Sequence, residues 1–229
     1  MDFYGLNKTT LLDYPGHVAA TLFTGGCNFR CPFCHNKDLL ETLGEAPLQE
    51  EEILEFLQKR RTVLQGVCIT GGEPTLQPGL EEFIRKVKEM GYLVKLDTNG
   101  GKPEVLARLL RLEVLDYVAM DVKAAPCHYA TAAGRENVLT QVRQSVDMLK
   151  GWSGMYEFRT TVVKGIHTKE EFADIATWLE GCRAYYLQSY RENENVLCKG
   201  YTAFAKEELE EICDLLKSRG IPVSLRGIE

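Results

Sequence analysis

Several features that would assign the chain to other classes of protein are missing from its 229 residues. No run of about 18 apolar residues is present, so the sequence predicts no membrane-spanning helix. The first residues lack the basic and then apolar regions of a secretory signal peptide. Basic residues are outnumbered, 27 Lys and Arg against 33 Asp and Glu, and the net charge of −6 argues against nonspecific binding to nucleic acid or anionic membranes. We therefore expect a cytoplasmic protein with neither kind of partner.

Internal repeats, low-complexity tracts and long Pro, Gly or Ser linkers are also missing. Hydrophobic residues make up 45% of the chain and charged residues 26%, which is typical of a globular protein with its own core. We expect residues 1–229 to form a single domain, since α/β barrels of this length routinely fold as one unit.

Eight cysteines are present, which is enough to raise the question of disulfides. Three of them lie within eight residues of one another, and the other five are scattered singly. In a reducing cytosol, clustered cysteines more often hold metal or perform redox chemistry. The pattern therefore indicates a metal or cluster site. Of the scattered five, Cys68, Cys182 and Cys213 fall in strand or helix patterns and are expected to be core residues.

Strand and helix patterns alternate along the chain. Short apolar segments bounded by turn residues predict strands at His17–Thr24, Gly66–Thr70, Tyr92–Asp97, Leu115–Asp121, Met155–Val163 and Ala184–Gln188. Amphipathic patterns predict helices at Gln49–Arg61, Leu80–Met90, Pro103–Leu110, Arg135–Lys150, Lys169–Leu179 and Lys206–Arg219, followed by a short final strand. The alternation predicts an α/β fold with a parallel sheet. Six repeats indicate a partial, TIM-like (β/α)6 barrel with an open side and its chemistry at the C-terminal ends of the strands.

The three clustered cysteines follow the first predicted strand with the spacing CxxxCxxC, as Cys27, Cys31 and Cys34. A short loop with glycines before it can wrap three thiolates around an iron–sulfur cubane and leave the fourth iron open. The alternative is a structural zinc ion held by these cysteines and a fourth ligand. His35 adjoins Cys34, so both would reach one tetrahedral ion only with strain, and no second CxxC or HxxxH exists.

Polar motifs follow the next strands at the places where a barrel puts its chemistry. The paired glycines of Gly71–Pro74 allow the backbone to approach a ligand closely. Asp97 and Thr98 end the third strand and precede an Asn-Gly pair that is typical of a turn. Asp121 and Lys123 are two residues apart, so extended backbone points them to the same side, where a salt bridge at the rim is the simplest alternative.

Together these residues make the chain resemble the radical S-adenosylmethionine (SAM) superfamily, whose signature is CxxxCxφC with an aromatic residue at φ, here Phe33. The resemblance implies a [4Fe–4S] cluster on Cys27, Cys31 and Cys34 that binds SAM at its open iron. It places Phe33 against the adenine, and it assigns the SAM amino group to Gly71, Gly72, Glu73 and Pro74. Asp97 and Thr98 would face the ribose or a nearby cation, and Asp121 and Lys123 would contact SAM.

Two further residues complete the expected cofactor site. Arg159 is a lone Arg in an apolar strand. A guanidinium that points into a barrel needs an anion, for which the SAM carboxylate is a candidate, whereas an outward-pointing Arg159 would pair with a helix carboxylate. Gln188, after the sixth strand, would touch the cofactor. Arg191 stands where some related enzymes carry a histidine.

Within the superfamily, Lys8–Gly16 and Cys34–Asn36 resemble the activating enzymes of glycyl radical enzymes, above all those of anaerobic ribonucleoside-triphosphate reductase. The resemblance implies an oxidoreductase that receives one electron from flavodoxin or ferredoxin, cleaves SAM reductively and takes a hydrogen atom from a glycine of its partner. Activation of another glycyl radical enzyme, such as pyruvate formate-lyase, and modification of a small molecule or peptide are the alternatives.

Overall fold

A curved, mostly parallel sheet forms the centre of the molecule in the computed structural model, which describes residues 1–41 and 48–228. Its strands follow the order β1-β2-β3-β4-β5-β6-β7-β9, and β8 pairs with β6. The strands are β1 (Gly5–Thr10), β2 (Ala19–Thr24), β3 (Gly66–Gly71), β4 (Leu93–Thr98), β5 (Tyr117–Asp121), β6 (Met155–Lys164), β7 (Tyr185–Ser189), β8 (Thr202–Ala203) and β9 (Val223–Arg226). Neighbours from β2 to β9 along this order are parallel, whereas β1 runs antiparallel to β2.

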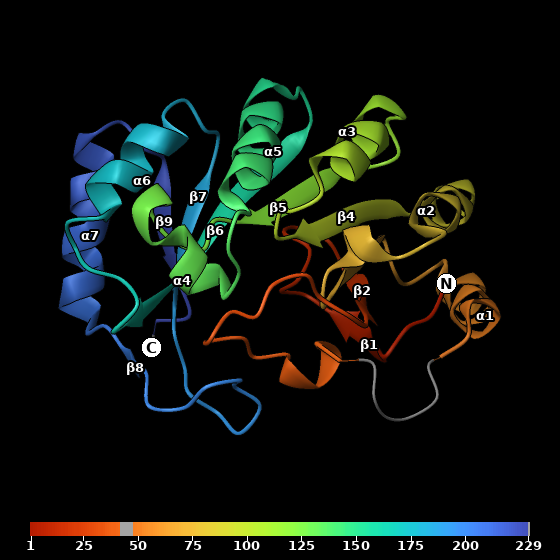
Figure 1. Cartoon of the computed structure of the whole chain (residues 1–229). Coiled ribbons are helices and arrows are strands. Elements are labelled where there is room, and N and C mark those ends of the chain that lie inside the picture. The colour runs from red at the N-terminus through yellow and green to blue at the C-terminus, as the bar shows by residue number, and fades with distance from the viewer. Residues whose placement is uncertain (42–47, 229) are drawn as a thin grey trace.

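Helices cover the outer side of the sheet (Figure 1). They are α1 (Glu50–Arg60), α2 (Leu80–Glu89), α3 (Pro103–Arg111), α4 (Tyr129–Ala133), α5 (Leu139–Gly151), α6 (Phe172–Leu179) and α7 (Lys206–Ser218). The buried residues of α2 show why these segments pack, because Leu80, Phe83, Ile84 and Val87 form one apolar stripe at helical spacing. The strands between the helices and the barrel interior are buried, as parallel strands in such folds usually are.

The predicted α/β fold is confirmed. All six predicted strands and the final strand are present, and they form the parallel sheet that the alternation indicates. The sheet does not close, because β1 and β9 stand at opposite ends of the strand order. The architecture is therefore the open, partial barrel that six repeats predict.

Several parts of the fold differ from the sequence-based prediction, among them the short elements α4 and β8, which were not predicted. β1 was not predicted, because Gly5–Thr10 has no alternating apolar pattern and its side chains are largely exposed at the sheet edge. The predicted helix at Arg135–Lys150 begins only at Leu139. Asn137 has a left-handed backbone (φ 60°), which a continuous helix does not allow, and the short α4 precedes it.

The C-terminal ends of β2 to β6 meet at one edge of the barrel, where the predicted motifs lie. All eight cysteines fall within the described residues and none is in a disulfide. Cys68, Cys182 and Cys213 are buried, as predicted, and Cys127 and Cys198 are exposed. Among the described residues, no helix is long and apolar enough to cross a membrane.

Candidate radical SAM site

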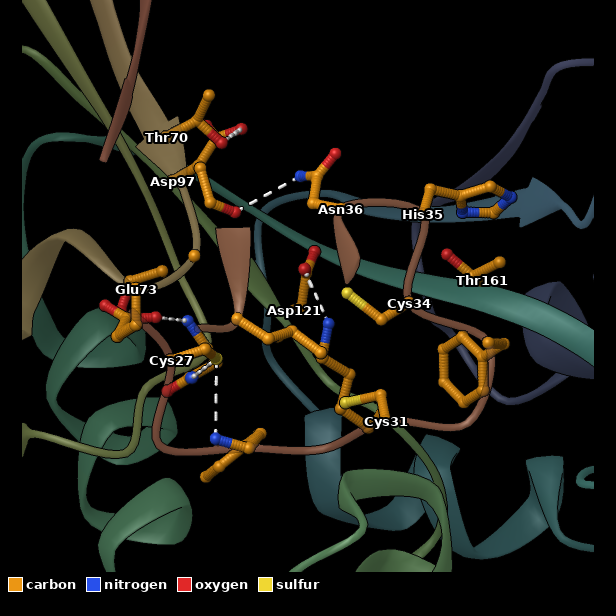
Figure 2. Close-up of a pocket in the computed structure, with 18 of the residues that line it drawn as sticks. Cys27, Cys31, Cys34, His35, Asn36, Thr70, Glu73, Asp97, Asp121 and Thr161 are labelled. Carbon is orange, nitrogen blue, oxygen red and sulfur yellow. Dashed lines mark hydrogen bonds and ion pairs between the residues drawn. The ribbon is translucent and has the colours of Figure 1, made fainter. Parts of the chain in front are cut away.

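One cavity at the strand ends collects most of the predicted site residues (Figure 2). The three clustered cysteines face it from the loop after β2, and the motifs after β3, β4 and β5 face it from the other side. The predicted residues that line it are Cys27, Cys31, Phe33, Cys34, Gly71, Gly72, Glu73, Asp97, Thr98, Asp121, Lys123 and Arg159. Pro74 and Gln188 are not among its lining residues. Five separate segments of the chain therefore meet around one space.

Backbone hydrogen bonds fix the cysteine loop at both ends. Before Cys27, the Gly26 N–H donates to the Leu39 carbonyl (2.7 Å), and after it the Arg30 N–H donates to the Ala133 carbonyl at the end of α4 (2.9 Å). Cys31 is buried, and Cys27 and Cys34 are half-buried toward the cavity. The loop is therefore held in place by its neighbours before any ligand enters.

The segment after β7 also supports this loop. The Leu197 N–H donates to the Cys34 carbonyl (3.0 Å), and the Cys198 N–H donates to the Pro32 carbonyl (2.8 Å). Nε2 of His35 donates to the Arg191 carbonyl (2.6 Å). Arg191 therefore supports the cysteine loop through its backbone oxygen. Because Cys198 supports the loop through its backbone, its thiol is not needed for this contact.

The donors around the cysteines suit a cubane better than a single zinc ion. Among residues 1–41 and 48–228, no three His, Cys, Asp or Glu side chains are grouped closely enough to hold one metal ion. A cubane is larger, and its three thiolates bind three different irons. Sγ of Cys27 already accepts hydrogen bonds from the Phe29 N–H (3.4 Å) and from Nδ2 of Asn99 (3.7 Å). Hydrogen bonds to the sulfurs are one of the ways in which proteins set cluster potentials.

Glu73 joins the ends of β3 and β4 beneath the cavity. Its carboxylate is buried and accepts four hydrogen bonds, of which those from the Thr98 hydroxyl and the Asn99 N–H (both 2.7 Å) cross between the strands. Burial raises the pKa of Glu73, although the donors oppose that shift. The carboxylate therefore holds the ends of β3 and β4 together. Its Oε1 accepts three of the four hydrogen bonds.

A half-buried ion network lies opposite the cysteines. Arg159 donates to Asp121 (2.9 Å) and to Asp97 (3.1 Å). Lys123 pairs with the other oxygen of Asp121 (2.8 Å), and Lys95 pairs with Asp97. Three cations and two carboxylates give the network a net positive charge, which complements a cluster that carries three thiolates.

The network holds its groups in their charged forms. Burial alone would raise the pKa of Asp121, but Arg159 and Lys123 beside it hold that pKa well below its usual range. Arg159 and Lys95 lower the pKa of Asp97 against the same effect of burial. Burial raises the pKa of the Cys31 thiol to about 12, with Lys123 opposing that shift. Binding of a cluster at these thiols must therefore release protons.

Arg159 points into the barrel, which is one of the two orientations that the sequence leaves open. It donates there to Asp97 and Asp121, two partners that were not predicted. Contact between Arg159 and the SAM carboxylate stays a prediction. Asp121 and Lys123 do share one side, as predicted, and they form the salt bridge that was the alternative. Because Asp121 and Lys123 line the cavity, their salt bridge is part of the site.

Gln188 lies on the other side of the Asp97–Arg159 pair. It lines a neighbouring cavity at the open edge of the sheet, together with Leu12 and Arg226, and Asp97 and Arg159 line both cavities. Contact between Gln188 and the cofactor stays a prediction. Phe33 lines the main cavity with its ring 6.2 Å from that of His167.

Two residues of the site were missed. The sequence analysis read Asn99 as part of a turn, but its side chain lines the cavity and donates to Cys27. His167 is buried behind Lys123, where Nε2 donates to the Lys123 carbonyl (2.8 Å) and Nδ1 accepts from the Val163 N–H (3.0 Å). Burial lowers the pKa of His167, so this histidine is a neutral support. The Asn-Gly turn sequence gives no sign that the Asn99 side chain reaches a cysteine 72 residues away. No sequence motif surrounds His167.

Comparison with known families shows which superfamily the chain belongs to. The model of the radical SAM superfamily matches residues 21–179, which include the cysteine loop and strands β3 to β6. The chain belongs to the radical SAM superfamily. Radical SAM proteins use a [4Fe–4S] cluster and SAM, and the cavity between the three cysteines and the ion network is where the residues fit both groups.

Relatives narrow the family further. A protein of Methanocaldococcus jannaschii, named as a candidate glycyl-radical enzyme activating enzyme, is 34% identical over 199 residues, 83% of this chain and 80% of the relative. The pyruvate formate-lyase-activating enzyme of Clostridium pasteurianum is 31% identical over 132 residues, 54% of this chain and 55% of that enzyme. This radical SAM protein therefore belongs to the glycyl-radical enzyme activating enzymes.

The fold has solved counterparts among radical SAM proteins. Streptococcus suis SuiB, in a crystal structure with bound SAM, matches with a TM-score of 0.71 over 91% of this chain and 52% of SuiB, at 13% identity. Such low identity supports the shared fold alone.

Gly72→Ala tests how closely the motif after β3 packs on the cysteine loop. A Cβ at residue 72 would lie 2.1 Å from the Gly26 carbonyl oxygen, which cannot move without displacing Cys27. We expect destabilisation of about 1–3 kcal/mol and reduced iron binding, measured by urea unfolding and iron analysis. Gly151→Ala, where a Cβ meets nothing within 4 Å, is the control; it should lose no stability and should leave iron binding unchanged. Wild-type iron content in Gly72→Ala would contradict the close packing.

Asn99→Ala tests the hydrogen bond to Cys27. Removing this donor leaves more negative charge on the thiolate, so we expect the midpoint potential of the reconstituted cluster to become more negative. Redox titration followed by electron paramagnetic resonance (EPR) measures it. Asn36→Ala is the control, since Nδ2 of Asn36 lines the same cavity but donates to the Gly71 carbonyl (3.2 Å). An unchanged potential in Asn99→Ala would refute this role.

Proposed function

We propose that the protein activates a glycyl radical enzyme by taking a hydrogen atom from the Cα of one of its glycines, and that the partner is anaerobic ribonucleoside-triphosphate reductase. The observation that carries the proposal is the one cavity in which three cysteines face a half-buried ion network. The resemblance of Lys8–Gly16 and Cys34–Asn36 to the activating enzymes of this reductase supports the partner.

We assign Cys27, Cys31 and Cys34 to the cluster, which when bound with SAM supplies the one-electron cleavage and the hydrogen-atom abstraction. The chain's own residues bind and orient the groups. Gly71 and Gly72 bring backbone close to the SAM amino group, and Glu73 fixes that backbone through Thr98 and Asn99. Lys123 and Arg159, held by Asp121, supply positive charge for a carboxylate. Phe33 closes the cavity with an apolar ring that helps to exclude water.

A protein substrate is supported by the open edge of the barrel. The turn between β1 and β2 carries Leu11 and Leu12, which are 72% and 88% exposed. They line the neighbouring cavity at this edge, which shares Asp97 and Arg159 with the main one. Exposed apolar side chains beside a cavity are typical of a surface that meets another macromolecule.

The test is anaerobic incubation of the reconstituted protein with SAM, a one-electron reductant and purified anaerobic ribonucleoside-triphosphate reductase, followed by EPR. A glycyl radical signal is expected, and it should be lost when the partner's radical glycine is replaced by alanine. Leu12→Ser should lower the radical yield while leaving SAM cleavage without partner unchanged. SAM cleavage without any glycyl signal would contradict the proposed partner.

The second candidate partner is pyruvate formate-lyase, because the Clostridium pasteurianum relative is named as the activating enzyme of that lyase. The same incubation with pyruvate formate-lyase in place of the reductase separates the two. A stronger glycyl radical signal with the lyase would identify the lyase as the partner in place of the reductase. The proposed activating reaction would stay the same.

A further inference from the structure

A surface cavity lies directly outside the cysteine loop, on the side away from the SAM cavity. It is lined by Asn28 of the loop, by Gly101 and Lys102 before α3, and by Arg135 between α4 and α5. Cys27 lines the inner cavity and Asn28 the outer one, although the two residues are consecutive. At this point, consecutive residues of the loop separate the surface cavity from the proposed cluster site.

Asn99 bridges this wall. Its Nδ2 donates both to Sγ of Cys27 (3.7 Å) and to Oδ1 of Asn28 (2.8 Å), and its own Oδ1 accepts from the Gly101 N–H (2.8 Å). The packing is close, since a Cβ added at Gly101 would lie 2.5 Å from Nδ2 of Asn28. A continuous path of bonded and hydrogen-bonded atoms thus joins the outer cavity to a cluster thiol. Electron transfer needs such a short path, because its rate falls steeply with distance.

The charge of this surface differs from that of the whole protein. Lys102 and Arg135 line the outer cavity, and the exposed Arg30 follows two residues after Asn28. Two carboxylates accompany these three cations, Glu136 in the cavity wall and Glu104 at 3.7 Å from Lys102. The surface is therefore net positive in a chain whose net charge is −6. An acidic protein is repelled by the chain as a whole and attracted here.

The other sides of the cysteine loop are occupied. The segment after β7 covers the Pro32–Cys34 part through the Leu197 and Cys198 N–H groups. The inner side faces the SAM cavity. Among the described parts of the chain, the Asn28 side combines exposure, positive charge and a direct path to a cluster ligand.

We propose that this surface, defined by Asn28, Lys102 and Arg135, is the docking site of a small acidic one-electron carrier protein of the flavodoxin or ferredoxin type. In the exchange the carrier is oxidised by one electron and the cluster is reduced by one, with the electron entering past Asn28 and Asn99 toward Cys27. The inference rests on the assignment of Cys27 as a cluster ligand in the proposed function. It does not depend on which enzyme is activated.

The experiment measures reduction of the reconstituted cluster by stopped-flow spectroscopy under anaerobic conditions, with no glycyl radical enzyme present. The variant is Lys102→Glu/Arg135→Glu, and the control is Lys59→Glu/Lys206→Glu, which changes the net charge equally on α1 and α7. Reduced flavodoxin and reduced ferredoxin are tested separately. Photoreduction with deazaflavin measures reduction without protein docking, and iron analysis confirms that each variant holds its cluster.

At low ionic strength we expect reduction by the carrier to be at least about tenfold slower in Lys102→Glu/Arg135→Glu than in the wild type. Added salt should slow the wild type and narrow the difference. Photoreduction and the control variant should match the wild type. A carrier that shows the loss is the one that uses this surface. Wild-type rates with both carriers, or an equal loss in the control variant, would overturn the proposal. Loss of iron from the wild-type protein itself would instead contradict the cluster assignment.

Discussion

Cys31→Ala is expected to abolish cluster binding and with it all SAM cleavage. Cys31 is the most deeply buried of the three clustered cysteines, and its loop is fixed by hydrogen bonds to Ala133 and Leu39. The loop therefore holds the Cys31 thiolate in a fixed place that an alanine cannot fill. The reconstituted wild type should hold about four irons per chain, whereas the variant should hold less than one. Iron and sulfide analysis, with the visible absorbance of the cluster, measures the effect.

Cys198→Ala is the matched control for this substitution. Cys198 is exposed, and it supports the cysteine loop through its N–H to the Pro32 carbonyl, so its side chain should be dispensable. We expect wild-type iron content and wild-type SAM cleavage in Cys198→Ala. Full iron content in Cys31→Ala, or loss of iron in Cys198→Ala, would show that the ligand set has been assigned wrongly.

Asp121→Ala is expected to destabilise the fold by about 1–3 kcal/mol. Asp121 is the shared partner of Lys123 and Arg159, whose side chains are only 18% and 14% exposed, so its removal leaves two mostly buried cations with one carboxylate fewer. Breaking such an ion pair from one side costs more than the pair contributes, because the remaining charges stay largely out of water. Denaturant unfolding of the protein without cluster measures this cost and separates it from any loss of cofactor.

The control for the ion network is Glu55→Ala, which breaks an ion pair with Lys59 in which both side chains are more than 70% exposed. Such pairs contribute less than about 1 kcal/mol, so the variant should unfold almost like the wild type. Equal destabilisation by Asp121→Ala and Glu55→Ala would mean that the network is screened by solvent and that its role in the site is smaller than we infer.

Much of the fold was predictable because the inner strands are short apolar segments, and β2 to β5 are followed by distinctive motifs. The paired glycines after β3 and the Asp-x-Lys pattern after β5 mark strand ends by their chemistry, and helical spacing marks α2 and α7. The edge strand β1 has no such signal, because Gly5–Thr10 packs only one side against the sheet and is largely polar. Apolar periodicity arises from buried side chains, and an exposed edge strand has few of them.

The site was predictable residue by residue but not as a network. The sequence shows a lone Arg159 in an apolar strand, but the strand is buried on both faces, so alternation does not tell which way the guanidinium points. Its partners Asp97 and Asp121 come from two other strands, and only the parallel register of β4, β5 and β6 brings them together. Asn99 reaches Cys27 across 72 residues of sequence in the same way.

The central claim is that three cysteines hold a cluster whose open iron takes SAM. EPR of the reduced cluster, recorded with and without SAM on the same anaerobic sample, tests it directly. We expect a changed cluster signal on addition of SAM and, on standing, formation of 5′-deoxyadenosine and methionine in equal amounts. A cluster signal that is unaffected by SAM, with no 5′-deoxyadenosine formed, would contradict it.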